Sequence, residues 1–84
     1  MTKTIIDVRT PDEYSQGHIE GAVNISLSDI NNFEKYLTLS KDSQIILYCQ
    51  SGNRSAIAIQ ILDKKGYSNL INGINQDTVQ AKYR

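Results

Sequence analysis

The chain has 84 residues, which is enough for one compact domain and too few for two, so we expect a single domain over residues 1–84. Nine basic and nine acidic side chains give a formal net charge of zero, which argues against nucleic acid or an anionic membrane as a partner. A single cysteine excludes an intramolecular disulfide, and no apolar run approaches the ~20 residues of a membrane span. Because the N-terminal residues also lack the apolar stretch of a signal peptide, we expect a cytoplasmic protein.

The first third of the chain predicts two short strands with a short helix between them. Residues 4–8 are rich in β-branched side chains and predict a strand. Residues 10–13 read Thr-Pro-Asp-Glu, in which threonine is the expected N-cap, proline takes the first helical position and glutamate completes a capping box. The helix is expected to end near Gly17, and residues 22–25 predict the second strand.

The middle of the chain predicts a third strand with a buried position in the sheet. Ser28–Asp29 can cap a helix that carries Ile30, Phe33 and Leu37 at spacings of three and four, which is a core-facing stripe. Residues 45–48, Ile-Ile-Leu-Tyr, are apolar without alternation. Consecutive apolar residues are typical of a central strand covered on both faces.

The last part predicts a helix, a strand and a polar end. Residues 55–65 have apolar side chains on more than one face, so we expect a largely buried helix with Gly66 as its C-cap. Residues 69–71 predict a short strand, 72–73 read Asn-Gly and predict a turn, and 76–84 predict a short helix or a frayed tail.

Strands that alternate with helices indicate an α/β fold, in which parallel strands are joined by right-handed crossovers. We therefore expect a short central parallel sheet with helices on both faces. Ligands in such sheets bind beyond the carboxyl ends of the strands. Cys49 directly follows the strand predicted at 45–48, and so lies where a site is expected.

Cys49 is followed by a polar loop, residues 50–54, and by a helix that we expect to begin at Ser55. Backbone N–H groups and the positive end of a helix dipole favour a thiolate, and such settings lower the pKa of cysteine from about 8.5 to between about 3.5 and 7.5. Gly52 permits a sharp turn, and Arg54 would supply a nearby cation. A buried cysteine that only packs is the alternative, but the donor-rich loop favours a nucleophile.

Two separated motifs resemble the rhodanese-like domain, and within that family the small single-domain thiosulfate sulfurtransferases of bacteria. The first motif consists of Asp7-Val8-Arg9, Glu13-Tyr14, Gly17-His18-Ile19, Gly21-Ala22 and Asn24-Ile25. The second is the run from Tyr48 to Ser55, Tyr-Cys-Gln-Ser-Gly-Asn-Arg-Ser. The resemblance implies a rhodanese-like fold, Cys49 as the catalytic residue, no cofactor, and a substrate-binding loop made of Gln50, Ser51, Gly52, Asn53, Arg54 and Ser55.

The chain departs from this pattern near its C-terminal end, where Asn72-Gly73 replaces the usual glycine pair and no tryptophan follows. The given sequence also starts at the first predicted strand, so we expect it to lack the helix that often precedes the Asp7 motif in this family. We expect these departures to change the pocket rim and to leave the nucleophile and its loop untouched.

The expected reaction moves a sulfane sulfur from thiosulfate, or a similar donor, to cyanide or a thiol through a persulfide on Cys49. The acceptor comes from outside, and a protein thiol is possible, because the sequence has no second cysteine. Arg54 is expected to attract the sulfite end of the donor. Asp7 and Arg9 are possible supporting residues, although paired charges at a strand end are more often structural.

Two other functions stay open. A persulfide carrier or docking module for a partner enzyme also needs Cys49. A phosphatase or arsenate reductase is less favoured, because only four residues separate Cys49 from Arg54. The related phosphatases resemble one another in having five residues between their cysteine and arginine. One cysteine and one histidine, distant in sequence, predict no metal site.

Overall fold

The computed structural model describes residues 3–84. These residues form one sheet of four parallel strands in the order β2-β1-β3-β4. The strands are β1 (Lys3–Asp7), β2 (Val23–Asn24), β3 (Gln44–Tyr48) and β4 (Leu70–Ile74). The helices are α1 (Pro11–Ser15), α2 (Asn53–Lys64), α3 (Gln76–Lys82) and the 3₁₀ helix η1 (Leu27–Lys35). The expected α/β fold with a parallel sheet is confirmed.

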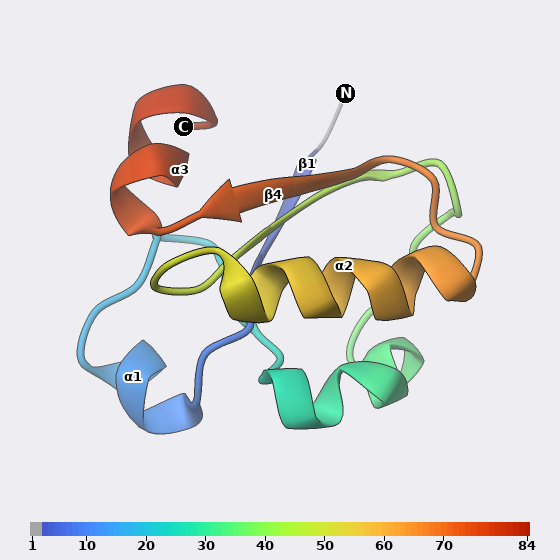
Figure 1. Ribbon diagram of the computed structural model, residues 1–84, viewed down its shortest axis with the longest axis horizontal. Coiled ribbons are helices and arrows are strands. Elements are labelled where there is room, and N and C mark those ends of the chain that lie inside the picture. Colours follow the sequence, from blue (N-terminus) through green and yellow to red (C-terminus); the bar gives the residue numbers. More distant parts are fainter. Residues whose placement is uncertain (1–2) are drawn as a thin grey trace.

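Helices cover both faces of this sheet, as expected. Helices η1 and α2 lie together on one face, and α3 lies on the other (Figure 1). Tyr14 of α1 and Val79 of α3 pack against the same smaller cluster, which includes Ile5, Ile46 and Tyr48. No helix within residues 3–84 has the length and apolar character needed to cross a bilayer.

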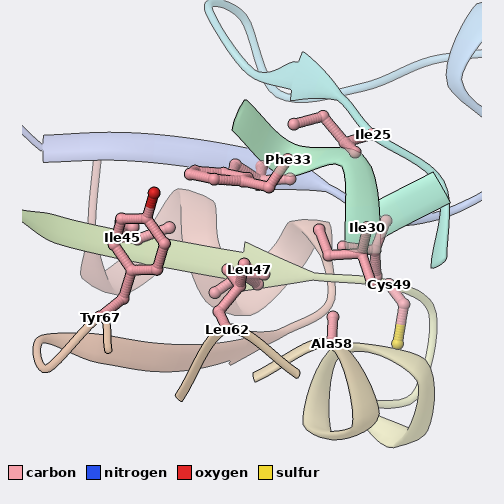
Figure 2. Close-up of a cluster of buried hydrophobic side chains, with 11 residues drawn as sticks. Ile25, Ile30, Phe33, Ile45, Leu47, Cys49, Ala58, Leu62 and Tyr67 are labelled. Atoms are coloured by element: carbon pink, nitrogen blue, oxygen red, sulfur yellow. The ribbon is translucent and has the colours of Figure 1, made fainter. Parts of the chain in front are cut away.

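The larger core lies between the sheet and the pair η1 and α2. Its buried side chains include Ile30 and Phe33 from η1, Leu47 from β3, and Leu62 from α2. Cys49 also belongs to this cluster and lies at one end of it (Figure 2). The thiol thus has apolar neighbours on its inner side, which limits its solvation.

Several predicted elements are confirmed because their signals are local. The capping box of α1 forms, with Glu13 N donating to Thr10 Oγ1 at 3.3 Å and Thr10 N donating to Glu13 Oε1 at 3.0 Å. Residues 45–48 of β3 are fully buried and pair with β1 and β4 on either side. The C-cap of α2 is Lys65, and Gly66, expected as the C-cap, is the next residue, with a left-handed φ of 103°.

Two helices differ from the prediction. The segment expected to be a helix capped by Ser28–Asp29 is the 3₁₀ helix η1, kinked at Asn32, and Leu37 lies beyond its end while still packing on the core. Helix α2 begins at Asn53 and not at Ser55, and it is not largely buried, since Ile57 is 48% exposed. Apolar side chains lie on more than one face of α2, and only the face toward the sheet is buried, so Ile57 remains exposed.

The predicted turn at 72–73 is wrong, because these residues continue β4. Asn72 pairs with Leu47 and Ile74 pairs with Tyr48, so Gly73 is an extra residue that forms a bulge. A Cβ on Gly73 would lie 2.6 Å from Val79 Cγ2, which is too close for any side chain. Asn72 and Gly73 therefore form a bulge of β4 that lies against α3, and the chain does not reverse direction there.

Candidate active site

The candidate site lies at the topological switch point of the sheet. The chain passes from β1 to β2 on one side and later to β3 on the other, so a crevice forms beyond the carboxyl ends of β1 and β3. Arg9, which follows β1, and Cys49, which follows β3, both line a cleft of about 500 Å³ there. Its other walls are Gln50, Ser51, Asn75, Gln76 and Asp77. The sequence did not indicate the wall at 75–77, because its approach depends on how α3 packs.

The Cys49 sulfur is surrounded by hydrogen-bond donors. Gly52 N donates to Cys49 Sγ at 3.1 Å, and Ser55 Oγ lies 3.5 Å from the same sulfur. Gly52 has a φ of 92°, which bends the loop around the sulfur and brings it to the N-terminus of α2. The thiol is buried, so it depends on these groups in place of water.

The pKa of Cys49 is lowered to about 7 by this environment. Burial alone would raise the pKa, because it disfavours the charged form. Hydrogen bonds from the Ser55 hydroxyl and from the backbone N–H groups of Ser55, Ser51 and Gly52 outweigh that effect. The loop therefore leaves a large fraction of the thiol ionised at neutral pH.

Arg54, expected as a cation near Cys49 that attracts the donor, has its charge compensated by a carboxylate. Its guanidinium is paired with the Glu13 carboxylate of α1, with Nη1 and Oε1 2.7 Å apart, and it does not line the cleft. The hydrogen bond that Arg54 donates to Glu13 is the main cause that raises the pKa of Arg54. Burial acts in the opposite direction, and the charges of Glu13 and Cys49 raise the pKa further. The low pKa of Cys49 thus rests chiefly on hydrogen bonds and not on this cation.

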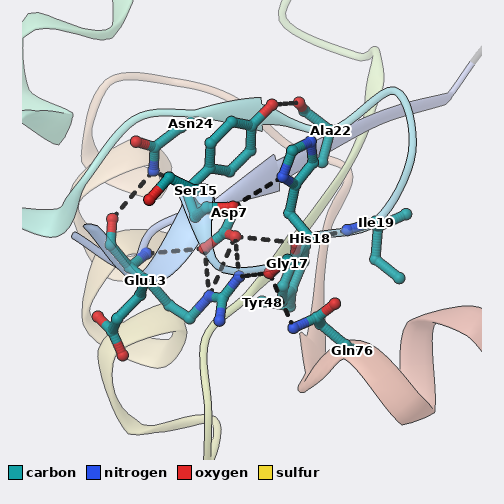
Figure 3. Close-up of polar contacts among 12 residues, drawn as sticks. Asp7, Glu13, Ser15, Gly17, His18, Ile19, Ala22, Asn24, Tyr48 and Gln76 are labelled. Atoms are coloured by element: carbon teal, nitrogen blue, oxygen red, sulfur yellow. Dashed lines mark hydrogen bonds and ion pairs between the residues drawn. The ribbon is translucent and has the colours of Figure 1, made fainter. Parts of the chain in front are cut away.

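Asp7 and Arg9 form a buried ion pair beside the cleft (Figure 3). Arg9 Nη2 donates to Asp7 Oδ2 at 2.6 Å, and Arg9 Nε donates to both carboxylate oxygens, at 2.9 Å and 3.0 Å. The Tyr48 hydroxyl donates to Asp7 Oδ2 at 2.9 Å and accepts from Ile19 N at 3.1 Å. Asp7 therefore fixes Arg9 in a defined orientation at the cleft wall.

The Gly17 carbonyl links the first motif to the wall formed by α3. It accepts from Arg9 Nη2 at 2.7 Å and from Gln76 Nε2 at 3.2 Å (Figure 3). Segments from the two ends of the described chain therefore meet at this carbonyl and form opposite parts of the cleft wall.

Asn72 contacts the active-site loop, contrary to the expectation that departures near the C-terminal end leave the loop untouched. Asn72 Oδ1 accepts from Ser55 Oγ at 2.7 Å and from Ile74 N at 3.0 Å. Asn72 Nδ2 donates to the Gly52 carbonyl at 3.1 Å. Asn72 thus ties β4 to both ends of the turn around Cys49.

A parallel sheet with a buried cysteine in a loop of N–H donors at its switch point defines an α/β domain whose candidate site is built around that cysteine. The family described as "Rhodanese-like domain" matches residues 1–77, and the chain belongs to that family. A solved structure described as "rhodanese with anions from E. coli" is 31% identical, with a TM-score of 0.83, and the match covers 92% of this chain and 91% of that one.

Two curated relatives carry names that concern sulfur. Thiosulfate sulfurtransferase PspE of Escherichia coli strain K12 is 36% identical over 67 residues, which are 80% of this chain and 64% of that protein. The putative sulfur carrier protein YrkF of Bacillus subtilis strain 168 is 35% identical over 68 residues, which are 81% of this chain and 36% of that protein. The chain thus spans less than two thirds of the length of these relatives.

Proposed function

We propose that this chain is a sulfurtransferase that moves a sulfane sulfur from thiosulfate, or a similar donor, to a thiophilic acceptor. The observation that carries the proposal is the sulfur of Cys49, which receives a hydrogen bond from Gly52 N at 3.1 Å and belongs to a residue that lines the cleft. A thiol with a pKa of about 7 is substantially ionised at neutral pH, and the thiolate is the nucleophilic form. The names of the relatives support the same chemistry.

The proposed reaction has two displacements. The Cys49 thiolate attacks the outer sulfur of thiosulfate, the bond between the two sulfur atoms of the donor breaks, and sulfite leaves with the electron pair of that bond. The product is a Cys49 persulfide anion, and total charge is conserved. Cyanide or an external thiolate then attacks the outer sulfur of this persulfide and regenerates the Cys49 thiolate as thiocyanate or a new persulfide leaves.

The loop and its neighbours would take distinct roles in this reaction. The loop from Gln50 to Ser55, including Asn53, would enclose the persulfide with backbone N–H groups. Arg9 would present its guanidinium to the sulfite end of the donor from the cleft wall, with Asp7 as its positioning partner. Arg54 would add long-range attraction, because Glu13 holds its guanidinium outside the cleft.

A persulfide carrier is a second candidate, and the surface beside the loop favours it. Ile74 is 40% exposed, and its Cγ2 lies 3.5 Å from the position of a Cβ on Gly52. An exposed apolar side chain beside Gly52 of the loop would suit contact with a protein that accepts or delivers sulfur. A phosphatase or arsenate reductase is the third and least favoured candidate, on the loop length given above.

We also infer that residues 1–84 act as one domain, because all strands of the described part join in one sheet. A compartment that keeps thiols reduced, such as the cytoplasm, would preserve the single cysteine in its active form. The proposed partners are a small sulfur donor and a thiol or cyanide acceptor, which a protein thiol could replace.

The test is thiocyanate formation from thiosulfate and cyanide by the purified chain, with Cys49→Ser as the matched control. Intact mass is recorded after exposure to thiosulfate alone. Turnover that is lost in Cys49→Ser supports the sulfurtransferase. Addition of one sulfur atom without turnover favours the carrier, and absence of both signals overturns the proposal and leaves the oxyanion enzymes.

A further inference from the structure

The Ser55 hydroxyl has one proton and three acceptors within reach. Its oxygen lies 2.7 Å from Asn72 Oδ1, 3.2 Å from the Gly52 carbonyl and 3.5 Å from Cys49 Sγ. A serine hydroxyl can donate only one hydrogen bond at a time, so these acceptors compete. Ser55 is fully buried, which confines the competition to this group of residues. The distances favour Asn72 as the acceptor.

The orientation of the Asn72 amide is fixed by two further contacts. Ile74 N, which can only donate, lies 3.0 Å from Oδ1, and the Gly52 carbonyl, which can only accept, lies 3.1 Å from Nδ2. This network assigns the oxygen and not the nitrogen to the side that faces Ser55. Asn72 therefore presents a lone pair to the Ser55 hydroxyl and cannot act as its donor there.

The two protonation states of Cys49 place opposite demands on this hydroxyl. When Cys49 is a thiol, its S–H can donate to Ser55 Oγ while the hydroxyl donates to Asn72, and every group is satisfied. When Cys49 is a thiolate, the sulfur is best stabilised if the hydroxyl turns toward it, because a charged acceptor forms the stronger bond. Asn72 then loses the donor at 2.7 Å.

We propose that Asn72 is a positioning residue that competes with the Cys49 thiolate for the Ser55 hydroxyl proton, and thereby favours the protonated thiol. This inference rests on the proposed function only in taking Cys49 as the nucleophile. Asn72 restrains the reactivity of the sulfur, and Ser55 carries its influence. The Gly52 carbonyl is a weaker competitor, since it already accepts the helical hydrogen bond from Ala56 N at 3.0 Å.

The experiment measures the rate of Cys49 alkylation by iodoacetamide as a function of pH, followed by intact mass. The variants are Asn72→Ala, Ser55→Ala and the double variant. Asn72→Ala is expected to move the midpoint of the profile to lower pH by about half a unit, which is about threefold more thiolate well below the midpoint. Ser55→Ala is expected to move the midpoint to higher pH. Asn72→Ala is expected to have no effect on the midpoint when Ser55→Ala is already present.

Asn69→Ala is the matched control, because its side chain makes no hydrogen bond to Ser55 or Cys49 within residues 3–84, and its midpoint should equal that of the wild type. Asn72→Gly serves as a second variant if Asn72→Ala fails to fold, as judged by circular dichroism. An unchanged or higher midpoint in the Asn72 variant overturns the inference, as does an equal shift with and without Ser55. Alkylation needs no sulfur donor, so a wild-type protein without thiosulfate turnover that still shows these shifts would contradict the proposed function alone.

Discussion

Glu13 holds Arg54 through both oxygens of its carboxylate, with Oε1 2.7 Å from Nη1 and Oε2 3.0 Å from Nη2. The pair joins α1 to the start of α2 and has the bidentate geometry of strong ion pairs. Its hydrogen bond from Arg54 is the main cause that lowers the pKa of Glu13 to about 2, and the backbone N–H of Thr10 adds to the effect. The pair therefore stays intact at any pH at which the protein is expected to work.

This ion pair predicts that Glu13→Gln improves binding of an anionic donor. Glutamine can still accept from Thr10 N and keep the capping box, but it leaves the Arg54 charge uncompensated. We expect the KM for thiosulfate to fall by roughly two- to fivefold at low salt, which is the range of a partly exposed ion pair, with little change in kcat. Steady-state thiocyanate formation measures both.

Glu34→Gln is the control for that prediction. Its carboxylate pairs with Lys65, and neither residue lines the cleft, so the same loss of charge should leave the KM unchanged. A KM that rises in Glu13→Gln would show that Arg54 serves the donor only in the position where Glu13 holds it.

The pH dependence of the first step should follow the ionisation of Cys49. Because the pKa of Cys49 is lowered to about 7, the rate of persulfide formation should rise with pH through about 7 and then level off. The thiol is protonated below that point and is then a poor nucleophile. Single-turnover mass spectrometry with limiting thiosulfate measures the rate. A midpoint near the ordinary cysteine pKa of about 8.5 would show that the hydrogen bonds of the loop do not stabilise the thiolate.

Asp77 places a carboxylate on the wall of the cleft that the proposed anionic donor would enter. It is exposed and forms no ion pair with any residue between 3 and 84, so its charge is not offset locally. Asp77→Asn should raise kcat/KM for thiosulfate by roughly two- to fivefold at low salt, and added salt should shrink the gain. Asp63→Asn, an exposed position on α2 outside the cleft, should show no gain. Equal values for Asp77→Asn and the wild type would exclude Asp77 from control of donor entry.

Gly73 has no room for a side chain between β4 and α3. A Cβ there would lie 2.6 Å from Val79 Cγ2 and 3.0 Å from Ile46 Cγ2. Gly73→Ala should lower the free energy of unfolding by about 1–3 kcal/mol, as overpacking of a core does. In a Val79→Ala background the nearest clash is absent, so the same substitution should cost less. Urea unfolding of the four proteins measures this coupling, and strictly additive costs would contradict the packing explanation.

The features predicted correctly from sequence depend on neighbours in the chain. Thr10 and Glu13 form a capping box within one helical turn, and the loop after Cys49 follows directly from a buried strand. The errors come from contacts between distant segments. Asn72 was assigned to a turn because Asn-Gly is a strong local signal, but pairing with Leu47 continues the strand through a bulge.

The same reason explains which parts of the site were missed. Glu13 and Arg54 are 41 positions apart, so no spacing rule could connect them. The contact between Asn72 and Ser55 requires β4 to lie beside β3 with α2 packed across both, and the wall at 75–77 requires α3 on the opposite face. Sequence reasoning located the sulfur and its loop, whereas the neighbours that tune them follow from tertiary packing.

The walls of the cleft are made at different times during protein synthesis. Arg9 leaves the ribosome early, Cys49 follows much later, and Asn75–Asp77 come after almost the whole of the described chain. The backbone of Cys49 also needs β4, because Cys49 N donates to the Ile74 carbonyl at 3.1 Å. A nascent chain that has emerged from the ribosome only as far as α2 still lacks β4 and α3, so the cleft around its cysteine is incomplete. The surroundings of Cys49 are therefore complete only after β4 and α3 have joined the fold.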